Sequence, residues 1–364
     1  MNSNHLIISL LGDIALNGLF VSQPGENKER FNEVKKILQK SDLVFANLET
    51  PLQGNRGPNK LKESKGVILY STENVYDQTL SGLNLTAVSL ANNHIFDGNK
   101  SGIKNTIKWL EKSGVKFTGA GYKKAHLEPV ILEKNHKRMG FLAYVHKDTH
   151  PMIPESSDTL INYFDEEKIS KEIGDIRNKC DLIILSIHWG MDYSFYPTKY
   201  QRLAGHKLID AGIDVIMGHH PHTLQPFEKY KDGLIFYSLG SLCFGDFIFE
   251  GKLRSLKLKT KQSMIVHLNE VKQITGLIPT KELIGNRVVL TEKNIRRNLS
   301  YKFYLMKLKH KFKLFDWIIR IKEAFFDRLI EYFFGYYRNP FIQLSSLKNL
   351  KKLKYSFRDF VKKG

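Results

Sequence analysis

The sequence has 364 residues, 42% of them hydrophobic, so it can build a large folded domain, and wholesale disorder is excluded. Its two cysteines, Cys180 and Cys243, exclude a disulfide framework and a cysteine-based zinc site, which suits a reducing compartment. The formal net charge of +19 is uneven, because residues 301–364 hold 16 Lys and Arg against 5 Asp and Glu. A segment this basic predicts an anionic partner surface.

The N-terminal residues predict a strand rather than a targeting segment. Residues 6–11 are apolar and lead directly into Gly12-Asp13, with no basic leader and no small-residue cleavage site. No other segment reaches the roughly 18 uncharged apolar residues of a spanning helix. We therefore expect a cytoplasmic protein without a signal peptide or transmembrane helix.

Apolar runs alternate with segments of helical periodicity along the first 270 residues. Helices are predicted over residues 28–40, 101–112 and 198–210, where apolar side chains recur every three or four positions. Buried strands are predicted at residues 6–11, 43–46, 86–90, 128–133, 139–145, 181–187, 213–217, 234–239 and 263–269. This alternation predicts an α/β fold with parallel strands.

Five of these apolar runs deliver polar side chains at their carboxyl ends. In chain order the groups are Asp13; Asn47 and Glu49; Asn92, Asn93 and His94; His188; and His219, His220 and His222. Sites in α/β sheets form outside the carboxyl ends of the strands, so we expect the five loops to converge.

Carboxylate, amide and imidazole groups without thiolates favour Mn²⁺, Fe²⁺ or Zn²⁺. Six or more candidate ligands exceed the needs of one tetrahedral ion, so a carboxylate-bridged pair about 3.5–4 Å apart is the economical interpretation. Taken singly, each residue has a simpler explanation. Asp13 could cap a turn, Glu49 could be a solvated loop carboxylate, Asn47 and Asn93 could be ordinary loop residues, and His94 or His188 could be a hydrogen-bonded core histidine.

The order of the short motifs carries a family resemblance. They are Gly-Asp at 12–13, Asn-Leu-Glu at 47–49, Ala-Asn-Asn-His at 91–94, His-Trp-Gly at 188–190, Gly-His-His-Pro-His at 218–222 and Tyr-Ser-Leu-Gly at 237–240. Over residues 6–247 this order resembles the CapA family of poly-γ-glutamate and capsule-synthesis proteins, a branch of the calcineurin-like metallophosphoesterases. The resemblance implies a metallophosphoesterase-like α/β/β/α sandwich.

The resemblance also implies roles for single residues. Asp13 resembles the first carboxylate ligand, and Glu49, with Asn47 as the alternative, resembles the bridging carboxylate. Asn93 resembles the amide ligand and His94 the histidine that protonates a leaving group. His188 and His220 resemble ligands of one metal and His222 a ligand of the other. Asn92 and His219 are left as supporting or alternative ligands.

The sequence departs from the superfamily pattern at two positions. Classical members have Asp-x-His at the first strand, where this chain has Ala15, so one metal loses an imidazole. The superfamily pattern also has Gly-Asn-Phe after its last strand. This chain has Gly240-Ser241-Leu242 there, so the amide side chain of the asparagine is absent.

The basic C-terminal segment predicts an amphipathic helix over residues 308–333. Seven of eight positions at alternating four- and three-residue steps are apolar, and Lys322 interrupts the stripe. The helix could pack on the catalytic domain or a partner helix, or lie on an anionic membrane at its inner face. Nucleic acid is disfavoured, because it would leave the apolar stripe unused.

The sequence therefore predicts a catalytic domain at 1–250, final strands and a connector at 251–299, and a basic helical extension at 300–364. We expect a metal-dependent hydrolase, similar to phosphoesterases, with two divalent ions and an anionic polymer or phosphoester substrate in capsule or poly-γ-glutamate synthesis. The alternative is a non-catalytic assembly factor that binds a polyanionic polymer or a membrane synthase.

Overall fold

The structure is a computed structural model that describes residues 5–55, 57–63, 67–249, 252–254, 260–283 and 285–291. The predicted helix at 308–333 and the whole extension at 300–364 lie outside these residues. Within the described part of the chain, no helix is long and apolar enough to cross a membrane.

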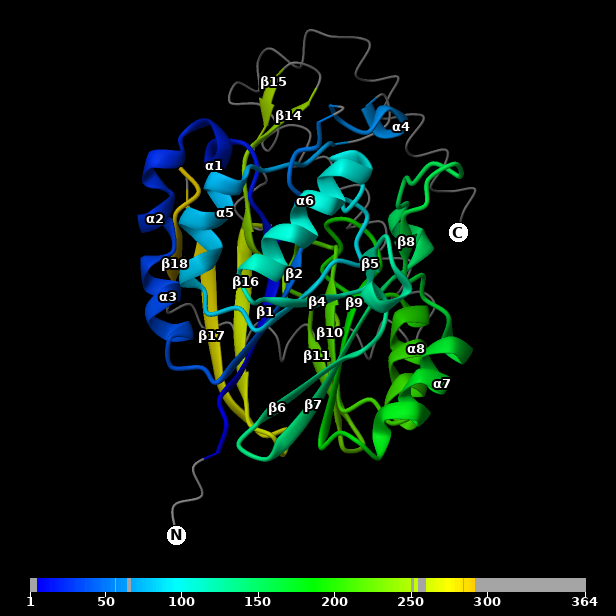
Figure 1. Ribbon diagram of the computed structural model, residues 1–364. Helices are drawn as coiled ribbons and strands as arrows, with labels where there is room; N and C mark the ends of the chain where they lie inside the picture. The colour runs from blue at the N-terminus through cyan, green and yellow to red at the C-terminus, as the bar shows by residue number, and fades with distance from the viewer. Residues whose placement is uncertain are drawn as a thin grey trace, which may run out of the picture.

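Strands and helices alternate along the first two-thirds of the chain (Figure 1). The strands are β1 (Ile8–Ala15), β2 (Leu43–Leu48), β3 (Ala87–Ser89), β4 (Lys116–Thr118), β5 (Ala120–Gly121), β6 (Val130–Lys134), β7 (Lys137–Val145), β8 (Leu160–Ile161), β9 (Leu182–His188), β10 (Val215–His219), β11 (Phe227–Tyr230), β12 (Gly233–Phe236), β13 (Ser241–Phe244), β14 (Phe247–Phe249), β15 (Lys252–Arg254), β16 (Gln262–Leu268), β17 (Ile274–Glu282) and β18 (Val288–Leu290). The α-helices are α1 (Leu19–Ser22), α2 (Asn27–Arg30), α3 (Asn32–Leu38), α4 (Lys60–Glu63), α5 (Glu73–Thr79), α6 (Asn99–Lys112), α7 (Glu166–Arg177) and α8 (Lys199–Asp210).

Two large sheets form the centre of the molecule. The first has eight strands in the order β18-β17-β16-β1-β2-β3-β4, with β13 also pairing with β1. The second has six strands in the order β11-β12-β10-β9-β7-β6. The strands that carry the predicted site residues run parallel within each sheet, β1 with β2 and β3 in the first and β9 with β10 in the second. Their carboxyl ends therefore lie at one edge of each sheet.

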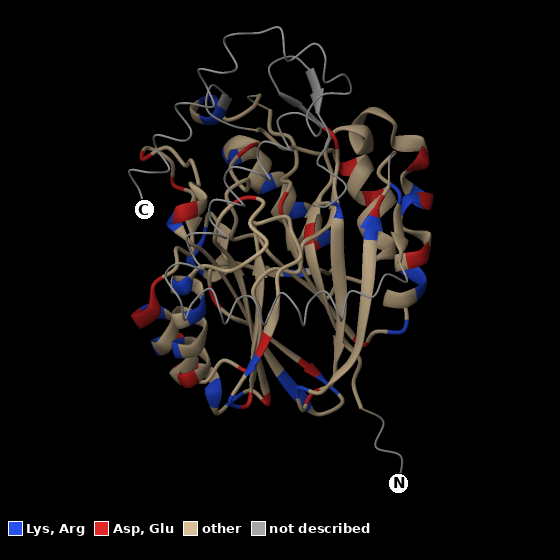
Figure 2. Cartoon of the chain, turned by 180° about the vertical axis from the view of Figure 1, so that it is seen from behind, with Lys and Arg blue, Asp and Glu red and all other residues tan. Residues whose placement is uncertain are grey.

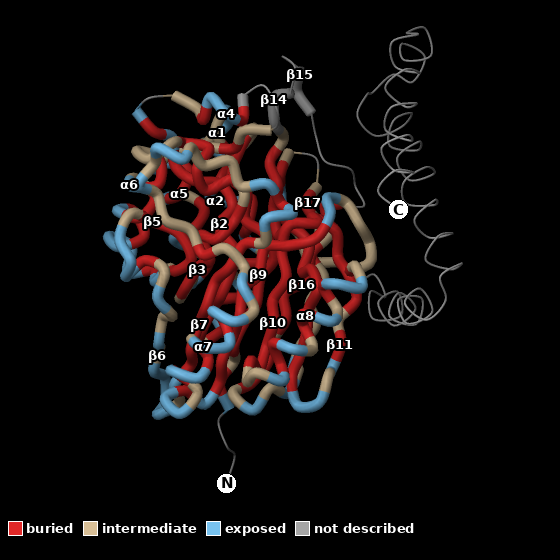
Figure 3. The backbone as a smooth tube through the Cα atoms, turned by 90° about the vertical axis from the view of Figure 1, so that its right-hand side faces the viewer, coloured by how far each residue is buried: buried red, intermediate tan, exposed pale blue. Residues whose placement is uncertain are grey.

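The apolar side chains form three layers. Along β9, Leu182 and Ile184 face the first sheet, whereas Ile183 and Leu185 face the helices α7 and α8. This alternation follows from the two-residue period of a strand, and it needs both faces to be covered. Figure 3 shows the result, buried strands within a shell of exposed loops, and Figure 2 shows charged residues on the helices, on the loops and on parts of the strands.

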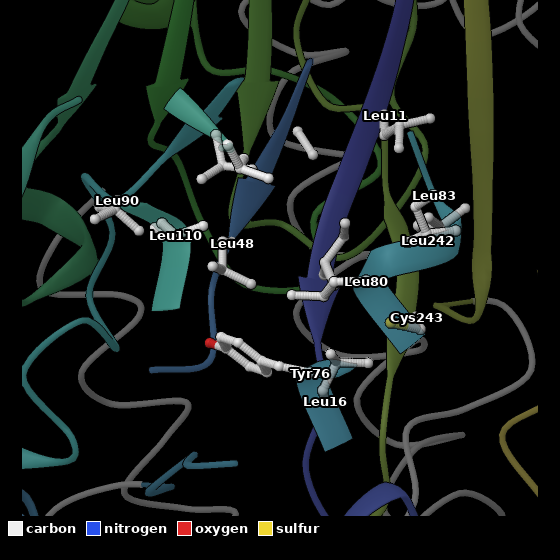
Figure 4. Packing of buried hydrophobic residues seen from close by; sticks show 14 of the residues in the cluster. Leu11, Leu16, Leu48, Tyr76, Leu80, Leu83, Leu90, Leu110, Leu242 and Cys243 are labelled. Carbon is white, nitrogen blue, oxygen red and sulfur yellow. The ribbon is translucent and has the colours of Figure 1, made fainter. Parts of the chain in front are cut away.

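The third apolar layer lies between the first sheet and the helices α3, α5 and α6. Figure 4 shows part of it from close by, with side chains of β1 (Leu11), β2 (Leu48), α5 (Tyr76) and α6 (Leu110) in the same cluster. The order of layers is helices, sheet, sheet, helices. The α/β/β/α sandwich implied by the family resemblance is confirmed.

Several local predictions need correction. The helix predicted over 28–40 is wrong as one element, because the non-helical backbone at Phe31 (φ −115°, ψ 14°) divides it into α2 and α3. Strand β1 does not end at residue 11 but continues to Ala15, so Asp13 lies within the strand. The pairing of β1 with β2 shifts in register between Leu10 and Asp13, so the strand is irregular just before Asp13.

Candidate metal centre

Residues from the two sheets meet at their carboxyl edges. In the first sheet, Asp13 of β1 is the register partner of Asn47 of β2. In the second, His188 and His219, the last residues of β9 and β10, are partners. Contacts between the sheets join these pairs. Nδ1 of His219 lies 2.8 Å from Oδ1 of Asp13, and Nδ2 of Asn47 lies 3.3 Å from Nδ1 of His188.

Asp13 is held from several directions and is fully buried. Asn47 donates from Nδ2 to Oδ1 of Asp13 at 2.9 Å, and the backbone N–H of His220 donates to Oδ2 at 3.2 Å. Burial acts to raise the pKa of Asp13, but the neighbouring His219 and His222 outweigh it and hold that pKa well below its usual range. Asp13 is therefore a carboxylate at neutral pH.

Glu49 follows β2 and lies at the centre of the site. Its carboxylate is fully buried, and neither oxygen accepts a hydrogen bond. Three imidazole nitrogens surround Oε1 beyond hydrogen-bonding distance: Nε2 of His94 at 3.9 Å, of His188 at 3.8 Å and of His222 at 3.8 Å. A buried carboxylate without partners is rare, and this one is ringed by groups that can bind a cation.

The loop after β3 contributes residues with different tasks. Asn93 points its amide oxygen at His188, with Oδ1 3.0 Å from Nε2. Asn92 instead braces the loop, since its Nδ2 donates to the Leu48 carbonyl at 3.0 Å and its Oδ1 accepts from the backbone N–H of His94 at 3.1 Å. Asn93 thus faces the site, and Asn92 supports it.

The histidine loop after β10 has strained backbone geometry. His220 has φ 95° and His222 has φ 54°, values that residues with a Cβ rarely adopt. The turn through Pro221 sends the two rings in different directions. The His220 ring lies 4.8 Å from the ring of His188, whereas Nδ1 of His222 lies 3.5 Å from Oδ2 of Asp13. Such strain often marks functional sites.

The ionisation of the buried groups follows from their surroundings. Burial lowers the pKa of both His188 and His220, so their rings are neutral. Burial raises the pKa of Glu49 to about 8. Burial also acts to lower the pKa of His222, but the carboxylates of Glu49 and Asp13 overcome it and raise that pKa to about 9. Of these three histidines, His222 is therefore the one that carries a positive charge at neutral pH in the site without metal.

Atoms of Asp13, Glu49 and His222 all lie within 4.8 Å of one another, which is close enough to share one ion. Glu49, Asn93, His188 and His220 form the neighbouring group. The donor set is imidazole, carboxylate and amide, with no sulfur, and two of its carboxylate oxygens have no other partner. These residues fit a divalent metal of the Mn²⁺, Fe²⁺ or Zn²⁺ type.

The two departures from the superfamily pattern have distinct structural outcomes. Ala15 packs in an apolar cluster with Leu69 and Phe244. Ser241 lies with Oγ 3.0 Å from Nδ1 of His222, which fixes the ring of that histidine. Ala15 therefore contributes apolar packing, whereas Ser241 contributes a hydrogen bond to the site.

Three residues at the site were missed by the sequence analysis: Lys62, Asp97 and Asp192. Oδ2 of Asp97 lies 2.6 Å from Nδ1 of His94, and Nζ of Lys62 lies 2.8 Å from the same nitrogen. Asp192 lies with Oδ1 3.6 Å from Nε2 of His220. The three-residue spacing of His94 and Asp97 could have revealed that pair, because such residues lie side by side in a helical turn.

Comparison with known proteins shows the family to which this chain belongs. Residues 7–247 match the family described as bacterial capsule synthesis protein PGA_cap. The chain belongs to this bacterial capsule synthesis protein family. It is 31% identical over 224 residues to the capsule biosynthesis protein CapA of Bacillus anthracis, and 30% identical over 244 residues to the PGA biosynthesis protein CapA of Bacillus subtilis. The family resemblance found in the sequence is confirmed.

The matched region is a part of each relative. It covers 59% of this chain and 53% of the Bacillus anthracis protein, and 66% of this chain and 63% of the Bacillus subtilis protein. Among solved structures, the NAD nucleotidase of Haemophilus influenzae is similar with a TM-score of 0.41 and 13% identity, covering 83% of this chain and 63% of that one. A likeness this distant carries no argument about activity.

Proposed function

We propose that this member of the bacterial capsule synthesis protein family is a metal-dependent phosphoester hydrolase that serves capsule or poly-γ-glutamate assembly. The relatives in the two Bacillus species are named for capsule and PGA biosynthesis, which supports the biological setting. The chemistry is supported by the site itself.

One observation carries the proposal. The carboxylate of Glu49 is fully buried, has no hydrogen-bond partner on either oxygen, and lies 3.8–3.9 Å from three imidazole nitrogens. Leaving a buried carboxylate unpaired is costly, and a bound cation is the partner that these donors fit. Glu49 is therefore the bridging ligand in our proposal.

Two groups of residues would hold the ions. Asp13, Glu49 and His222 would hold one, and Glu49, Asn93, His188 and His220 the other. When bound, such ions supply hydroxide at neutral pH and stabilise the charge of a phosphoryl group in displacement. His219 would hold Asp13 in place, and Asn47 would do the same from the other side through its donated hydrogen bond.

His94 is the residue that we assign to the leaving group. Its Nε2 is on the side of Glu49, whereas its Nδ1 faces Asp97 and Lys62. As the phosphorus–oxygen bond breaks, the departing oxygen needs a hydrogen, and Nε2 of His94, 3.9 Å from Oε1 of Glu49 and not assigned to an ion, is the donor in our proposal. General acid catalysis of this kind contributes about 10²–10⁴ in rate.

A second candidate function is a non-catalytic assembly factor that binds a polyanionic polymer or a membrane synthase. The observation that favours it is the apolar packing of Ala15 with Leu69 and Phe244, at the position where the superfamily pattern has a histidine ligand. A protein with this function would keep the fold and lose the turnover.

The test combines metal content with turnover. We expect purified protein, reconstituted with manganese, to bind at least one ion per chain and to hydrolyse bis(p-nitrophenyl) phosphate. His188→Ala should lose metal by mass spectrometry. His94→Ala should keep its metal and lose about 10²–10⁴ in kcat. His206→Ala is the matched control, since His206 pairs with Glu228 away from the site.

The outcomes separate the two functions. Metal binding without any hydrolysis would favour the assembly factor. Less than about one ion per chain, together with no effect of His188→Ala, would refute the metal site and the hydrolase with it.

A further inference from the structure

Helix α6 carries a row of lysines along its length. The helix lies on the outer side of the first sheet (Figure 1), and its apolar face packs in the core. It holds a single acidic residue, Glu111. Its basic residues are four positions apart, and side chains at this spacing form a ridge on a helix surface. These residues, which we call the lysine row, are Lys100, Lys104, Lys108 and Lys112.

The ammonium groups of the lysine row have few acidic partners. Lys100 pairs with Asp158, an exposed residue of the loop before β8. The other three lysines of the row are exposed, and no described residue forms an ion pair with them. Lys123 adds an ammonium beside the row, since Nζ of Lys104 and Nζ of Lys123 lie 5.5 Å and 5.7 Å from the ring centroid of Tyr122. The row is therefore a positive surface that is open to solvent.

A helix face that only meets water does not need such a row. Like charges four residues apart repel each other and weaken a helix. Helix α7 of the same protein has the usual arrangement, in which acidic and basic residues are mixed and Nζ of Lys168 lies 3.8 Å from Oε1 of Glu172. The lysine row therefore costs helix stability, and a negatively charged partner along α6 would restore it.

The lysine row starts beside the candidate metal centre. The loop after β3 carries His94 and leads directly into α6. The backbone N–H of Asp97 donates to the His94 carbonyl at 2.8 Å, and α6 begins two residues later at Asn99. From Lys100 the row extends for about 18 Å away from the centre, at about 1.5 Å per residue. A linear polymer that lies along the row therefore has one end next to the centre.

We propose that the lysine row binds γ-linked polyglutamate, a linear polymer with one carboxylate per residue. Successive lysines of the row are about 6 Å apart along the helix. An α-linked residue has three chain atoms and spans at most about 3.6 Å. A γ-linked glutamate has five chain atoms, so by the same measure it spans about 6 Å. Each carboxylate of the extended γ-linked chain then meets one lysine. The choice of polymer rests on the proposed function.

A membrane surface is a poorer match for the lysine row. Helices that lie on membranes carry large apolar side chains beside their basic residues. The large apolar side chains that are exposed in the described part of the chain all lie outside α6. Charge and spacing, without an apolar anchor, match a soluble polyanion.

Fluorescence anisotropy of full-length, metal-free protein tests the proposal at low salt. The probe is a fluorescein-labelled γ-linked glutamate decamer, and the α-linked decamer with the same number of carboxylates is the comparison. We expect the parent protein to bind the γ-linked decamer more tightly. The triple variant Lys104→Gln, Lys108→Gln, Lys112→Gln should bind it about tenfold more weakly, because each exposed ion pair contributes a factor of a few. Glutamine is a good helix former, so the variant should keep its circular dichroism spectrum.

A second triple variant is the matched control. Lys134→Gln, Lys171→Gln, Lys179→Gln removes the same charge from exposed positions outside α6 and should bind like the parent protein. Both variants keep residues 301–364, so the difference between them reports on α6 alone. Equal weakening in the two variants would overturn the proposal, because net charge would then explain the binding.

The comparison of probes tests the choice of polymer. Equal affinity of the parent protein for the two glutamate decamers, or tighter binding of a DNA decamer, would overturn the assignment to the γ-linked chain. Binding to phosphatidylserine vesicles that depends on the row, without such binding of the decamer, would assign the row to a membrane instead. Absence of bis(p-nitrophenyl) phosphate hydrolysis would refute the proposed hydrolase alone, because the anisotropy measurement needs neither metal nor turnover.

Discussion

Glu49 shows at the scale of one residue how a site can be unstable by itself and stable with a ligand. Its buried carboxylate lacks hydrogen bonds, and burial raises its pKa to about 8. An unsatisfied buried polar group costs about 1–3 kcal/mol. Above pH 8, where the Glu49 side chain of the parent protein is ionised, Glu49→Gln keeps the shape and removes the buried charge. We therefore expect the metal-free variant to be more stable than metal-free parent protein by this order, measured by urea unfolding in EDTA.

With manganese added, the parent protein should become more stable than Glu49→Gln. The parent protein gains stability from the bound ion by mass action, whereas Glu49→Gln has lost the bridging ligand and gains little. Glu166→Gln, which removes a carboxylate paired with Lys207 near the surface, is the control and should respond to manganese like the parent. Equal stabilisation of Glu49→Gln by manganese would show that Glu49 does not bind the ion.

Much of the candidate site could be predicted from single residues. Asp13, Glu49, Asn93, His188 and the histidine loop converge as expected, because apolar runs with polar ends mark the carboxyl edges of buried strands. Lys62 could not be found in this way. Its position depends on how residues 53–71 fold back over the site, and no local pattern encodes a contact between Lys62 and His94, 32 residues apart.

The helices leave local patterns in the sequence, and not every such pattern led to a prediction. Helix α7 was missed, although Asp165 accepts from the backbone N–H of Lys168 as an N-cap, and Ile169, Ile173 and Ile176 recur at helical spacing. Helix α6, predicted at 101–112, is confirmed with its start at Asn99. Short strands such as β13 depend on partners distant in sequence, so periodicity alone does not reveal them.

Strand β13 links the site to a buried charge on β17. The backbone N–H of Phe244 donates to Oε2 of Glu282 at 2.9 Å, and the ring of Phe244 packs edge-on against His222. Glu282 is fully buried, and Nζ of Lys261 lies 3.9 Å from Oε2. Burial raises the pKa of Glu282 to about 7; Lys261, the Phe244 N–H and Arg30 oppose this shift, and Asp246 adds to it.

This raised pKa predicts the pH dependence of stability. The folded protein binds the Glu282 proton more tightly than the unfolded chain, whose glutamate has its ordinary pKa of 4.5. The stabilising contribution is therefore complete below pH 4.5 and is lost as the pH rises through about 7. Relative to Glu282→Gln, the parent protein should lose on the order of 3 kcal/mol of unfolding free energy between pH 5 and 8.

Urea unfolding of both proteins in EDTA across that range measures the difference, because groups that titrate alike in both cancel. Glu172→Gln, a carboxylate of α7 distant from β17, should follow the parent curve. A parent-minus-variant difference that stays constant with pH, or that grows as the pH rises, would contradict the raised pKa.

At the scale of the whole molecule, the charge is unevenly distributed along the chain. Residues 301–364 hold 16 Lys and Arg against 5 Asp and Glu, and they lie outside the described residues. The apolar stripe over residues 308–333 predicts an amphipathic helix that lies on a membrane surface. Each basic residue held near an anionic surface contributes about 1 kcal/mol, so two lost contacts weaken binding about thirtyfold.

Deleting residues 301–364 should therefore release the protein from vesicles that contain phosphatidylserine, measured by co-sedimentation at low salt. Binding of the full chain should weaken as salt rises and should be absent from phosphatidylcholine vesicles, because the attraction to the surface is electrostatic. The truncated protein should retain the metal content of the parent, since every proposed ligand precedes residue 223. Unchanged vesicle binding by the truncated protein would assign the membrane contact to another part of the chain. Loss of metal together with loss of binding would instead mean that the segment supports the fold by packing on it.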